Sequence, residues 1–475
     1  MDHDRESMII KGRKALVLGA GKSGVASARF LAERGATVAL HDKREVEGWS
    51  DAARSLKTEL NVGLMDGDIP SWLLDQIDLV VISPGVPTNT IPARYVDRKD
   101  GEVIGEVELA FRYMKGRIVA ITGSNGKTTT TALIGELLKD AGIPTQVGGN
   151  IGTPLLSLAE TSVDDGWTVA ELSSFQLETI VDFRPNVGLC LNVTPNHLDR
   201  YEGFHEYALA KHRIFMNQNA DDVAVLNADD PITADWAKGL LANVVMFSVK
   251  RELEDGLFLR GNDLVCRANS KEKVLTTREE IFLKGLHNVE NVLAAFAAGL
   301  ACGADPESMR ETVKNFKGVE HRIEFVAEID GVRFYNDSKA TSVDATSKAL
   351  EALSGGEGKT ILILGGKGKN APYEPLVPLI KSSVRALVLI GEDADNIESQ
   401  LTGHAEIIRA GTMEDAVGKG FSAAESGDAV LLAPACASFD MFNSFEERGT
   451  VFKEAVRKLA ERTTPSAEAA ATPPS

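Results

Sequence analysis

The chain has 475 residues, enough for about three domains, and 43% of them are hydrophobic, enough for several cores. Its formal net charge of −18 argues against nucleic acid or an anionic membrane as the main partner. The four cysteines lie far apart and form no C-x-x-C pattern, which excludes a disulfide framework and is typical of a reducing cytoplasm.

The polar start, Met1 to Ser7, does not resemble a signal peptide, and no apolar run approaches the roughly 18 residues of a membrane span. We therefore expect a cytoplasmic protein without membrane insertion. A monomer is also expected, although no sequence feature determines the oligomeric state. The last residues, 463–475, are rich in Ala, Pro, Ser and Thr and predict a disordered tail.

A first α/β domain is predicted over residues 8–112. The strand Lys14-Ala-Leu-Val-Leu-Gly19 leads into Gly19-Ala-Gly21-Lys-Ser-Gly24, which fits G-x-G-x-x-G, and the second strand ends on Asp42. A further loop, Ser83-Pro84-Gly85, is expected at the same sheet edge. Taken alone, this pattern predicts an NAD-dependent dehydrogenase. The fold itself supplies only a diphosphate site and a hydroxyl-binding carboxylate, and the glycine turn could also be purely structural.

The central domain, residues 113–318, opens with the strand Ile118-Val-Ala-Ile-Thr122 and the turn Gly123-Ser-Asn-Gly-Lys-Thr-Thr129. A glycine turn between a strand and a helix N-terminus aims N–H groups at one point and forms a phosphate cradle. Lys127 would reach the terminal phosphates, and Thr128 would offer its hydroxyl to Mg²⁺. Ile121 stands where a standard P-loop has its first glycine. The turn nevertheless predicts a nucleoside triphosphate site.

Later strands of this domain end on further ligand-type side chains. Glu171 ends one strand, and His197 follows the next strand, Val187 to Val193. Oxygen ligands and retained waters suit magnesium, so Glu171 is a plausible ligand. His197 could equally be a structural histidine, and Lys211 could be a solvated helix lysine.

A third α/β pattern covers residues 319–462. Its strands lead into Asn336-Asp-Ser-Lys-Ala-Thr341, Gly365-Gly-Lys-Gly-Lys369 and Ser438-Phe-Asp-Met-Phe-Asn-Ser-Phe445. Two lysines near strand ends, Lys339 and Lys369, suit an anionic substrate. Surface lysines are the alternative.

Taken together, these motifs resemble the Mur ligases of bacterial cell-wall synthesis, from about Lys14 to Leu459. The resemblance rests on four further segments besides the turns above: Glu171-Leu-Ser-Ser-Phe-Gln-Leu-Glu178, Asn192-Val-Thr-Pro-Asn-His-Leu-Asp-Arg-Tyr201, Gly285-Leu-His-Asn288 with Asn291, and His321-Arg-Ile-Glu324. It implies an α/β fold of three domains: a Rossmann-like first domain, a central P-loop domain with a mainly parallel sheet, and a Rossmann-like third domain. The first domain, Lys369 and the segment Ser438 to Phe445 favour the branch that adds D-glutamate.

For that branch, the resemblance implies an ATP-dependent ligase that joins UDP-N-acetylmuramoyl-L-alanine to D-glutamate through an acyl phosphate. It also implies ATP, two Mg²⁺ ions and a CO₂ adduct, a carbamate, on Lys211. A different amino acid, as in other Mur ligases or folylpolyglutamate synthetase, is the nearest alternative. A non-catalytic nucleotide-binding module would have lost some of Lys127, Glu171, His197 and Lys211, and all four are present.

The resemblance also assigns residues to roles. Lys127, Lys211, His197 and Lys369 would act in catalysis. ATP would be bound by Gly123, Ser124, Asn125, Gly126, Lys127, Thr128, Thr129, Asn291, Arg322 and Asp337. The metal ions would be held by Thr128, Glu171, His197 and Lys211 as carbamate. The substrates would contact Gly21, Ser23, Gly24, Asp42, Lys43, Ser83, Asn150, Ser173, Lys339, Thr341, Lys369, Ser438 and Phe445.

Overall fold

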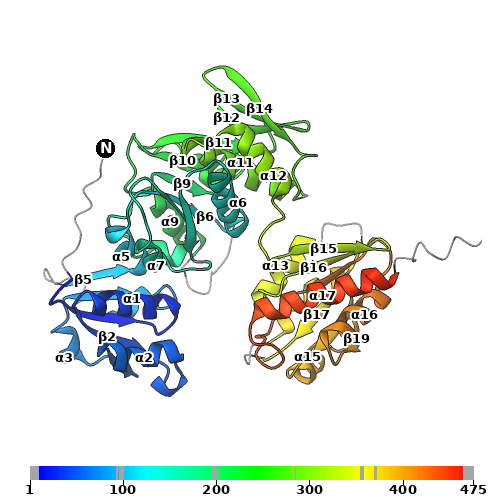
Figure 1. Ribbon diagram of the computed structural model, residues 1–475, viewed down its shortest axis with the longest axis horizontal. Coiled ribbons are helices and arrows are strands. Elements are labelled where there is room, and N and C mark those ends of the chain that lie inside the picture. The colour runs from blue at the N-terminus through cyan, green and yellow to red at the C-terminus, as the bar shows by residue number, and fades with distance from the viewer. Residues whose placement is uncertain are drawn as a thin grey trace, which may run out of the picture. The chain divides into compact units, whose positions relative to one another are not determined.

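The computed structural model describes residues 10–91, 95, 101–194, 201, 203–283, 285–353, 358–368 and 372–463. The chain divides into two compact units, one that reaches to Phe316 and one that begins at Lys317. Within the described residues, the strands form three sheets, of five, nine and six strands (Figure 1).

The first sheet is parallel throughout, in the order β3-β2-β1-β4-β5. Its central strands are short apolar runs that are almost wholly buried, as expected where helices cover both faces of a parallel sheet. Because β1 lies between β2 and β4, the chain leaves it at a topological switch point, where α/β sheets open a crevice. The elements are β1 (Lys14–Leu18), α1 (Lys22–Glu33), β2 (Thr37–Asp42), α2 (Asp51–Leu60), β3 (Gly63–Asp66), α3 (Ser71–Leu74), β4 (Leu79–Ile82) and β5 (Glu102–Gly105).

Helix α5 (Glu106–Tyr113) joins this sheet to the second one, which belongs to the same unit. The second sheet has the order β14-β13-β12-β11-β10-β9-β6-β8-β7 and is parallel from β12 to β7. Its strands are β6 (Arg117–Thr122), β7 (Thr145–Gly149), β8 (Trp167–Glu171), β9 (Val187–Cys190), β10 (Val223–Asn227), β11 (Asn243–Ser248), β12 (Gly256–Arg260), β13 (Asp263–Ala268) and β14 (Lys271–Thr277). Its helices are α6 (Lys127–Asp140), α7 (Leu155–Ala159), α8 (Ser174–Leu177), α9 (Phe204–His212), α10 (Pro231–Trp236), α11 (Leu286–Ala301) and α12 (Pro306–Asn315).

The second unit is built on the third sheet, in the order β15-β16-β20-β17-β18-β19, in which only the β15–β16 pair of these described strands is antiparallel. Helix α17 runs along β15 and β16 (Figure 1). The elements are β15 (Glu324–Ile329), β16 (Val332–Asn336), α13 (Val343–Leu353), β17 (Thr360–Gly365), α14 (Val377–Ser383), β18 (Val384–Ile390), α15 (Ala394–Leu401), β19 (Glu406–Arg409), α16 (Met413–Ala423), β20 (Ala429–Leu432) and α17 (Phe445–Thr463).

This architecture confirms the predicted fold class, since each sheet is mainly parallel and alternates with helices. Among the described helices, none is both long and apolar enough to cross a membrane.

Candidate active site

The turn after β6 has the geometry of a phosphate cradle. β6 ends at Thr122 and α6 begins at Lys127, so the turn residues lie at the N-terminus of a 14-residue helix. Gly126 has φ +80°, and a Cβ there would lie 2.3 Å from Oδ1 of Asn291 on α11. The glycine is therefore required both by its left-handed backbone and by the close approach of Asn291. This contact also places Asn291, a predicted ATP ligand, directly against the turn.

The cradle is anchored on Asn192, two residues after the end of β9. The N–H of Ser124 donates to the carbonyl of Asn192 (2.9 Å), and the N–H of Asn125 donates to the Asn192 side chain (2.8 Å). The Lys127 amine donates to the carbonyls of Gly123 (2.8 Å) and Ser124 (3.0 Å), so it lies folded over the turn. Thr129 is partly buried one residue beyond Thr128 on α6.

Glu171, at the carboxyl end of β8, joins the cradle to the loop after β7. Its carboxylate accepts from the Thr128 hydroxyl (2.8 Å) and from the Asn150 amide (2.9 Å), and its side chain is buried. A hydroxyl and a carboxylate beside a phosphate cradle are the oxygen donors that Mg²⁺ prefers. The described residues contain no cluster of three or more His, Cys, Asp or Glu, so phosphate oxygens and water would complete such a shell. The donor set fits magnesium.

Lys211 of α9 is buried beneath the same turn, with 2% of its surface exposed, and its amine donates to the Gly123 carbonyl (2.9 Å). Burial, followed by the positive charge of Lys127, lowers the pKa of Lys211 to about 7. Much of this amine is therefore neutral at neutral pH, which is the form that reacts with CO₂. This burial is inconsistent with the alternative that Lys211 is a solvated helix lysine. His197 lies outside the described residues.

Tyr207 is part of this site, although it belongs to none of the sequence motifs. It lies four residues before Lys211 on α9, so both side chains share one helix face. The Lys211 amine lies 4.6 Å from the centre of the Tyr207 ring, and the Tyr207 hydroxyl lies 3.1 Å from Oγ of Ser124. The four-residue spacing is the sequence signal that could have indicated it.

The glycine turn after β1 opens into a pocket of about 530 Å³. A Cβ on Gly24 would lie 1.7 Å from the Gly19 carbonyl oxygen, so this glycine lets α1 pack against the end of β1. The pocket is lined by the turn, by the loops after β2 and β4, by the loop after β7, and by Gln176. Its predicted substrate-binding residues are Gly21, Ser23, Asp42, Lys43, Ser83 and Asn150.

Two predicted contacts lie outside the lining of this pocket. Gly24 packs behind the turn, and Ser173 caps the N-terminus of α8 through a reciprocal pair of hydrogen bonds with Gln176. Asp42 accepts from the Ala20 N–H (2.9 Å) and pairs with Arg44, and that pairing holds the pKa of the Asp42 carboxyl well below its usual range. Arg44 also lines the pocket, and together with Lys22 and Lys43 it adds positive charge there.

In the second unit, a second group of predicted residues comes together around the end of β16. Asp337 is buried; burial raises its pKa to about 6, and the nearby positive charges of Arg322 and Lys339 oppose this rise. The Lys339 N–H donates to the His321 carbonyl (3.2 Å), and the Thr341 N–H donates to the Lys339 carbonyl (2.8 Å).

Arg448 joins this group to the segment that begins at Ser438. Its buried guanidinium donates to the Ser338 hydroxyl (2.9 Å), the Ser338 carbonyl (2.8 Å) and the Cys436 carbonyl (3.1 Å). The Ser338 hydroxyl in turn donates to the carbonyl of Phe445 (2.8 Å). Ser438, two residues after Cys436, is also buried. Lys369 lies outside the described residues.

Comparison with known proteins agrees with this arrangement. Three family models match: a Mur ligase MurD-like N-terminal domain (residues 13–105), a Mur ligase middle domain (121–299) and a Mur ligase glutamate ligase domain (321–436). The UDP-N-acetylmuramoylalanine–D-glutamate ligase of Acidobacterium capsulatum is 48% identical over 94% of this chain and 97% of its own. The same-named protein of Koribacter versatilis is 47% identical over 96% and 99%.

Solved structures show the same fold at lower identity. A pseudomurein peptide ligase type C from Methanothermus fervidus covers 94% of this chain and 100% of its own, at 21% identity and a TM-score of 0.53. UDP-N-acetylmuramate–alanine ligase from Thermotoga maritima covers the same shares at 20% identity and a TM-score of 0.52.

A glycine-turn cradle, a separate pocket and a second α/β unit fit the class of three-domain ATP-dependent ligases. Within that class, the chain belongs to the Mur ligase family.

Proposed function

We propose that this protein adds D-glutamate to UDP-N-acetylmuramoyl-L-alanine, with hydrolysis of ATP to ADP and phosphate, in peptidoglycan synthesis. Relatives that bear this activity in their names are 42–48% identical to this chain over 94–96% of its length. This function needs one site for the UDP-linked substrate and another for ATP. The two sites must lie close enough for the substrate carboxylate to reach the γ-phosphate.

The observation that carries the proposal is the path from Asn150 to Thr128. Asn150 lines the first-domain pocket, and its amide donates to Glu171, which accepts from Thr128 in the phosphate cradle. The UDP-linked substrate would lie with its diphosphate at the Gly21 turn, near Lys22 and Lys43. Its acyl end would then reach toward Asn150, two hydrogen bonds from the cradle that holds the ATP phosphates.

This adjacency suits activation of a carboxylate. A carboxylate oxygen is a poor leaving group, so the substrate carboxylate attacks the γ-phosphate of ATP and becomes an acyl phosphate. The amine of D-glutamate then attacks the acyl carbon, and phosphate leaves. The first step brings two anions together, and the cradle N–H groups and Lys127 reduce their repulsion.

Magnesium is the expected ion. Thr128 and Glu171 would hold one ion, and His197 with a carbamate on Lys211 would hold a second. When bound, the ions would neutralise phosphate charge and orient the γ-phosphate. A buried, partly neutral lysine amine fits this role, because an ammonium would repel a cation whereas a carbamate supplies two anionic oxygens.

The second unit would supply the amino-acid site. Asp337 and Arg322 would contact ATP, and Lys339, Thr341, Ser438 and Phe445 with Lys369 would bind the acyl phosphate or D-glutamate. We further propose three domains, with the limits 8–112, 113–318 and 319–462. The protein would act as a monomer in the cytoplasm, where ATP and UDP-linked precursors occur.

The test is phosphate release from ATP with Mg²⁺ and UDP-N-acetylmuramoyl-L-alanine, with D-glutamate, L-glutamate and meso-diaminopimelate offered in parallel. Release that requires D-glutamate supports the proposal. Release with another amino acid would leave the ligase chemistry intact and refute the assignment of the second unit. No release with any amino acid would refute the ligase function.

A further inference from the structure

Helix α5, which joins the first two sheets, carries two buried carboxylates. Glu106 has 2% of its surface exposed and Glu108 has none. Buried carboxylates are costly unless hydrogen bonds satisfy them, so the groups that each one binds are informative. The described partners of both carboxylates include main-chain N–H groups of the central domain.

Glu108 binds the loop that follows α8. One of its oxygens accepts three successive N–H groups, those of Val181 (2.8 Å), Asp182 (3.1 Å) and Phe183 (2.9 Å). Its other oxygen accepts from Nε of Arg112 (3.0 Å). Charge-assisted bonds of this kind are stronger than neutral ones, so the loop is held firmly on α5.

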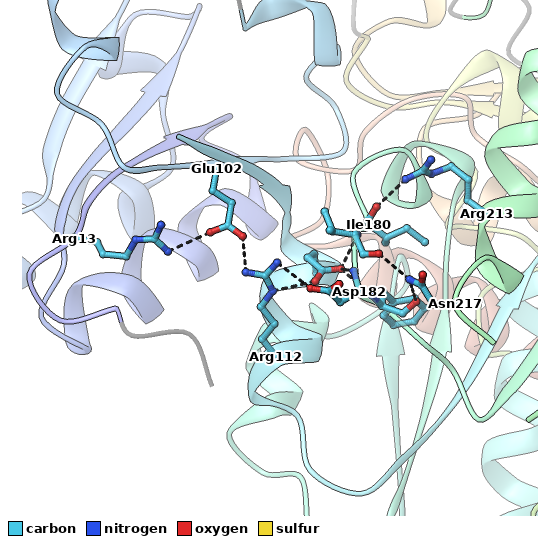
Figure 2. A network of polar contacts seen from close by, with 10 residues as sticks. Arg13, Glu102, Arg112, Ile180, Asp182, Arg213 and Asn217 are labelled. Atoms are coloured by element: carbon cyan, nitrogen blue, oxygen red, sulfur yellow. Dashed lines mark hydrogen bonds and ion pairs between the residues drawn. The ribbon is translucent and has the colours of Figure 1, made fainter. Parts of the chain in front are cut away.

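The same loop is held from its opposite side by the segment that follows α9. Arg213 donates to the carbonyls of Leu177 (2.8 Å) and Ile180 (2.7 Å). Asn217 donates to the carbonyls of Val181 (2.7 Å) and Phe183 (3.0 Å), and Figure 2 shows both side chains reaching the loop. The N–H groups of residues 181–183 thus face α5, whereas the carbonyls that Arg213 and Asn217 bind face the segment that directly follows α9.

Glu106 binds a second segment of the central domain, the start of α7, which follows a pocket-lining loop. One oxygen accepts from the N–H of Leu156 (2.7 Å) at the start of α7. This helix directly follows the loop from Gly149 to Pro154, which lines the pocket. The other Glu106 oxygen is buried without a hydrogen-bond partner among the described residues.

Helix α5 is also tied to the first sheet. Arg112 donates to Glu102 of β5 (2.6 Å), and the second oxygen of Glu102 accepts from Arg13 (3.2 Å), which precedes β1 (Figure 2). The Gly105 N–H donates to the Thr179 carbonyl (3.2 Å), which adds a direct main-chain bond between β5 and the loop. Helix α5 is therefore fixed to the sheet that carries the glycine turn of the pocket.

From these contacts we propose that Glu106 and Glu108 are positioning residues that set the two central-domain walls of the pocket against its first-domain wall. Glu106 holds the Gly149–Pro154 wall through α7, and Glu108 holds the Gln176 wall through the loop after α8. The inference deepens the proposed function, on which its kinetic consequence rests: misplacing either wall weakens binding of the UDP-linked substrate more than binding of ATP.

The first test compares Glu106→Ala with Glu106→Gln. Alanine leaves the Leu156 N–H without its acceptor, whereas glutamine keeps a carbonyl oxygen there. We expect Glu106→Ala to raise KM for the UDP-linked substrate at least about tenfold, because small displacements of substrate-positioning groups have effects of this size or larger. The KM for ATP should stay within about twofold, and Glu106→Gln should restore most of the loss.

Glu108→Gln is the second variant, and Asp428→Asn is its matched control. Asp428 is also a buried carboxylate that accepts two main-chain N–H groups and pairs with an arginine, Arg385, but it belongs to the second unit. Glu108→Gln should raise the same KM selectively, whereas Asp428→Asn should not. Equal KM values for wild type and both α5 variants would overturn the positioning role. A loss of activity that a smaller folded fraction fully accounts for would also overturn it.

Hydrogen exchange on the unliganded protein separates this inference from the proposed function. Glu108→Gln should speed amide exchange at Val181, Asp182 and Phe183 and around Gln176, and Glu106→Ala should speed it over residues 149–156. Asp428→Asn should leave both segments unchanged. If the wild type performs no ligation, the proposed function fails, and the exchange rates at the two walls still decide whether α5 positions them. Exchange at both walls that is unchanged in the two α5 variants would refute the positioning role.

Discussion

The amine of Lys211 donates to the main-chain carbonyl of Gly123 at 2.9 Å, so a buried lysine lies directly beneath the phosphate cradle. This contact joins α9 to the turn after β6. It also places the one atom of Lys211 that could bear a carbamate at the edge of the expected triphosphate site.

Lys211 is therefore predicted to carry CO₂. Protein supplied with ¹³C-bicarbonate should show a carbamate resonance in ¹³C NMR that is absent from Lys211→Met. The variant should lose ligation by roughly 100-fold or more, the scale of removing one group that stabilises transition-state charge. Activity of Lys211→Met near that of the wild type would contradict the prediction.

Glu171→Gln should weaken the nucleotide site. One carbonyl oxygen cannot replace the two carboxylate oxygens that accept from Thr128 and Asn150, and the amide adds no negative charge for a cation. We expect the Mg²⁺ concentration for half-maximal phosphate release to rise, with kcat lowered by about 100-fold. An unchanged magnesium dependence would remove Glu171 from the metal site.

Gly24→Ala should destabilise the first domain. The added methyl would overlap the Gly19 carbonyl, and a main-chain oxygen cannot move away without displacing the end of β1. Overpacking typically costs about 1–3 kcal/mol, and we expect a loss near the upper end of this range in the free energy of unfolding, measured with denaturant. Gly21→Ala is the control, because a Cβ there meets nothing within 4 Å and the backbone is already extended, with φ −81°.

Glu106 predicts a pH dependence of stability. Burial raises its pKa from 4.5 to about 7, so the folded state holds a proton that the unfolded state releases between these values. The free energy of unfolding should therefore fall by about 3 kcal/mol as pH rises from about 4.5 to 7, and this contribution should then level off. Glu106→Gln should remove this pH-dependent fall in stability. Glu59→Gln, a control on the surface, should retain it. Identical pH profiles for wild type and Glu106→Gln would contradict the prediction.

The local chemistry of the site was accessible from sequence because it depends on short motifs. The turn from Gly123 to Thr129 and the carboxylate that ends β8 were predicted from spacing, and the fold and family were confirmed. The roles of individual residues remain predictions. Glu106 and Glu108 gave no such signal, because their N–H partners lie 50 to 75 residues away and depend on how two sheets pack.

That separation along the chain affects synthesis as well. The first sheet is complete at Gly105, and N-terminal domains fold first as a chain emerges. The acceptors Glu106 and Glu108 then remain hydrated until Leu156 and Val181 to Phe183 have been made. The first domain can thus form early on the ribosome, but its junction with the central domain closes only after residue 183 has emerged.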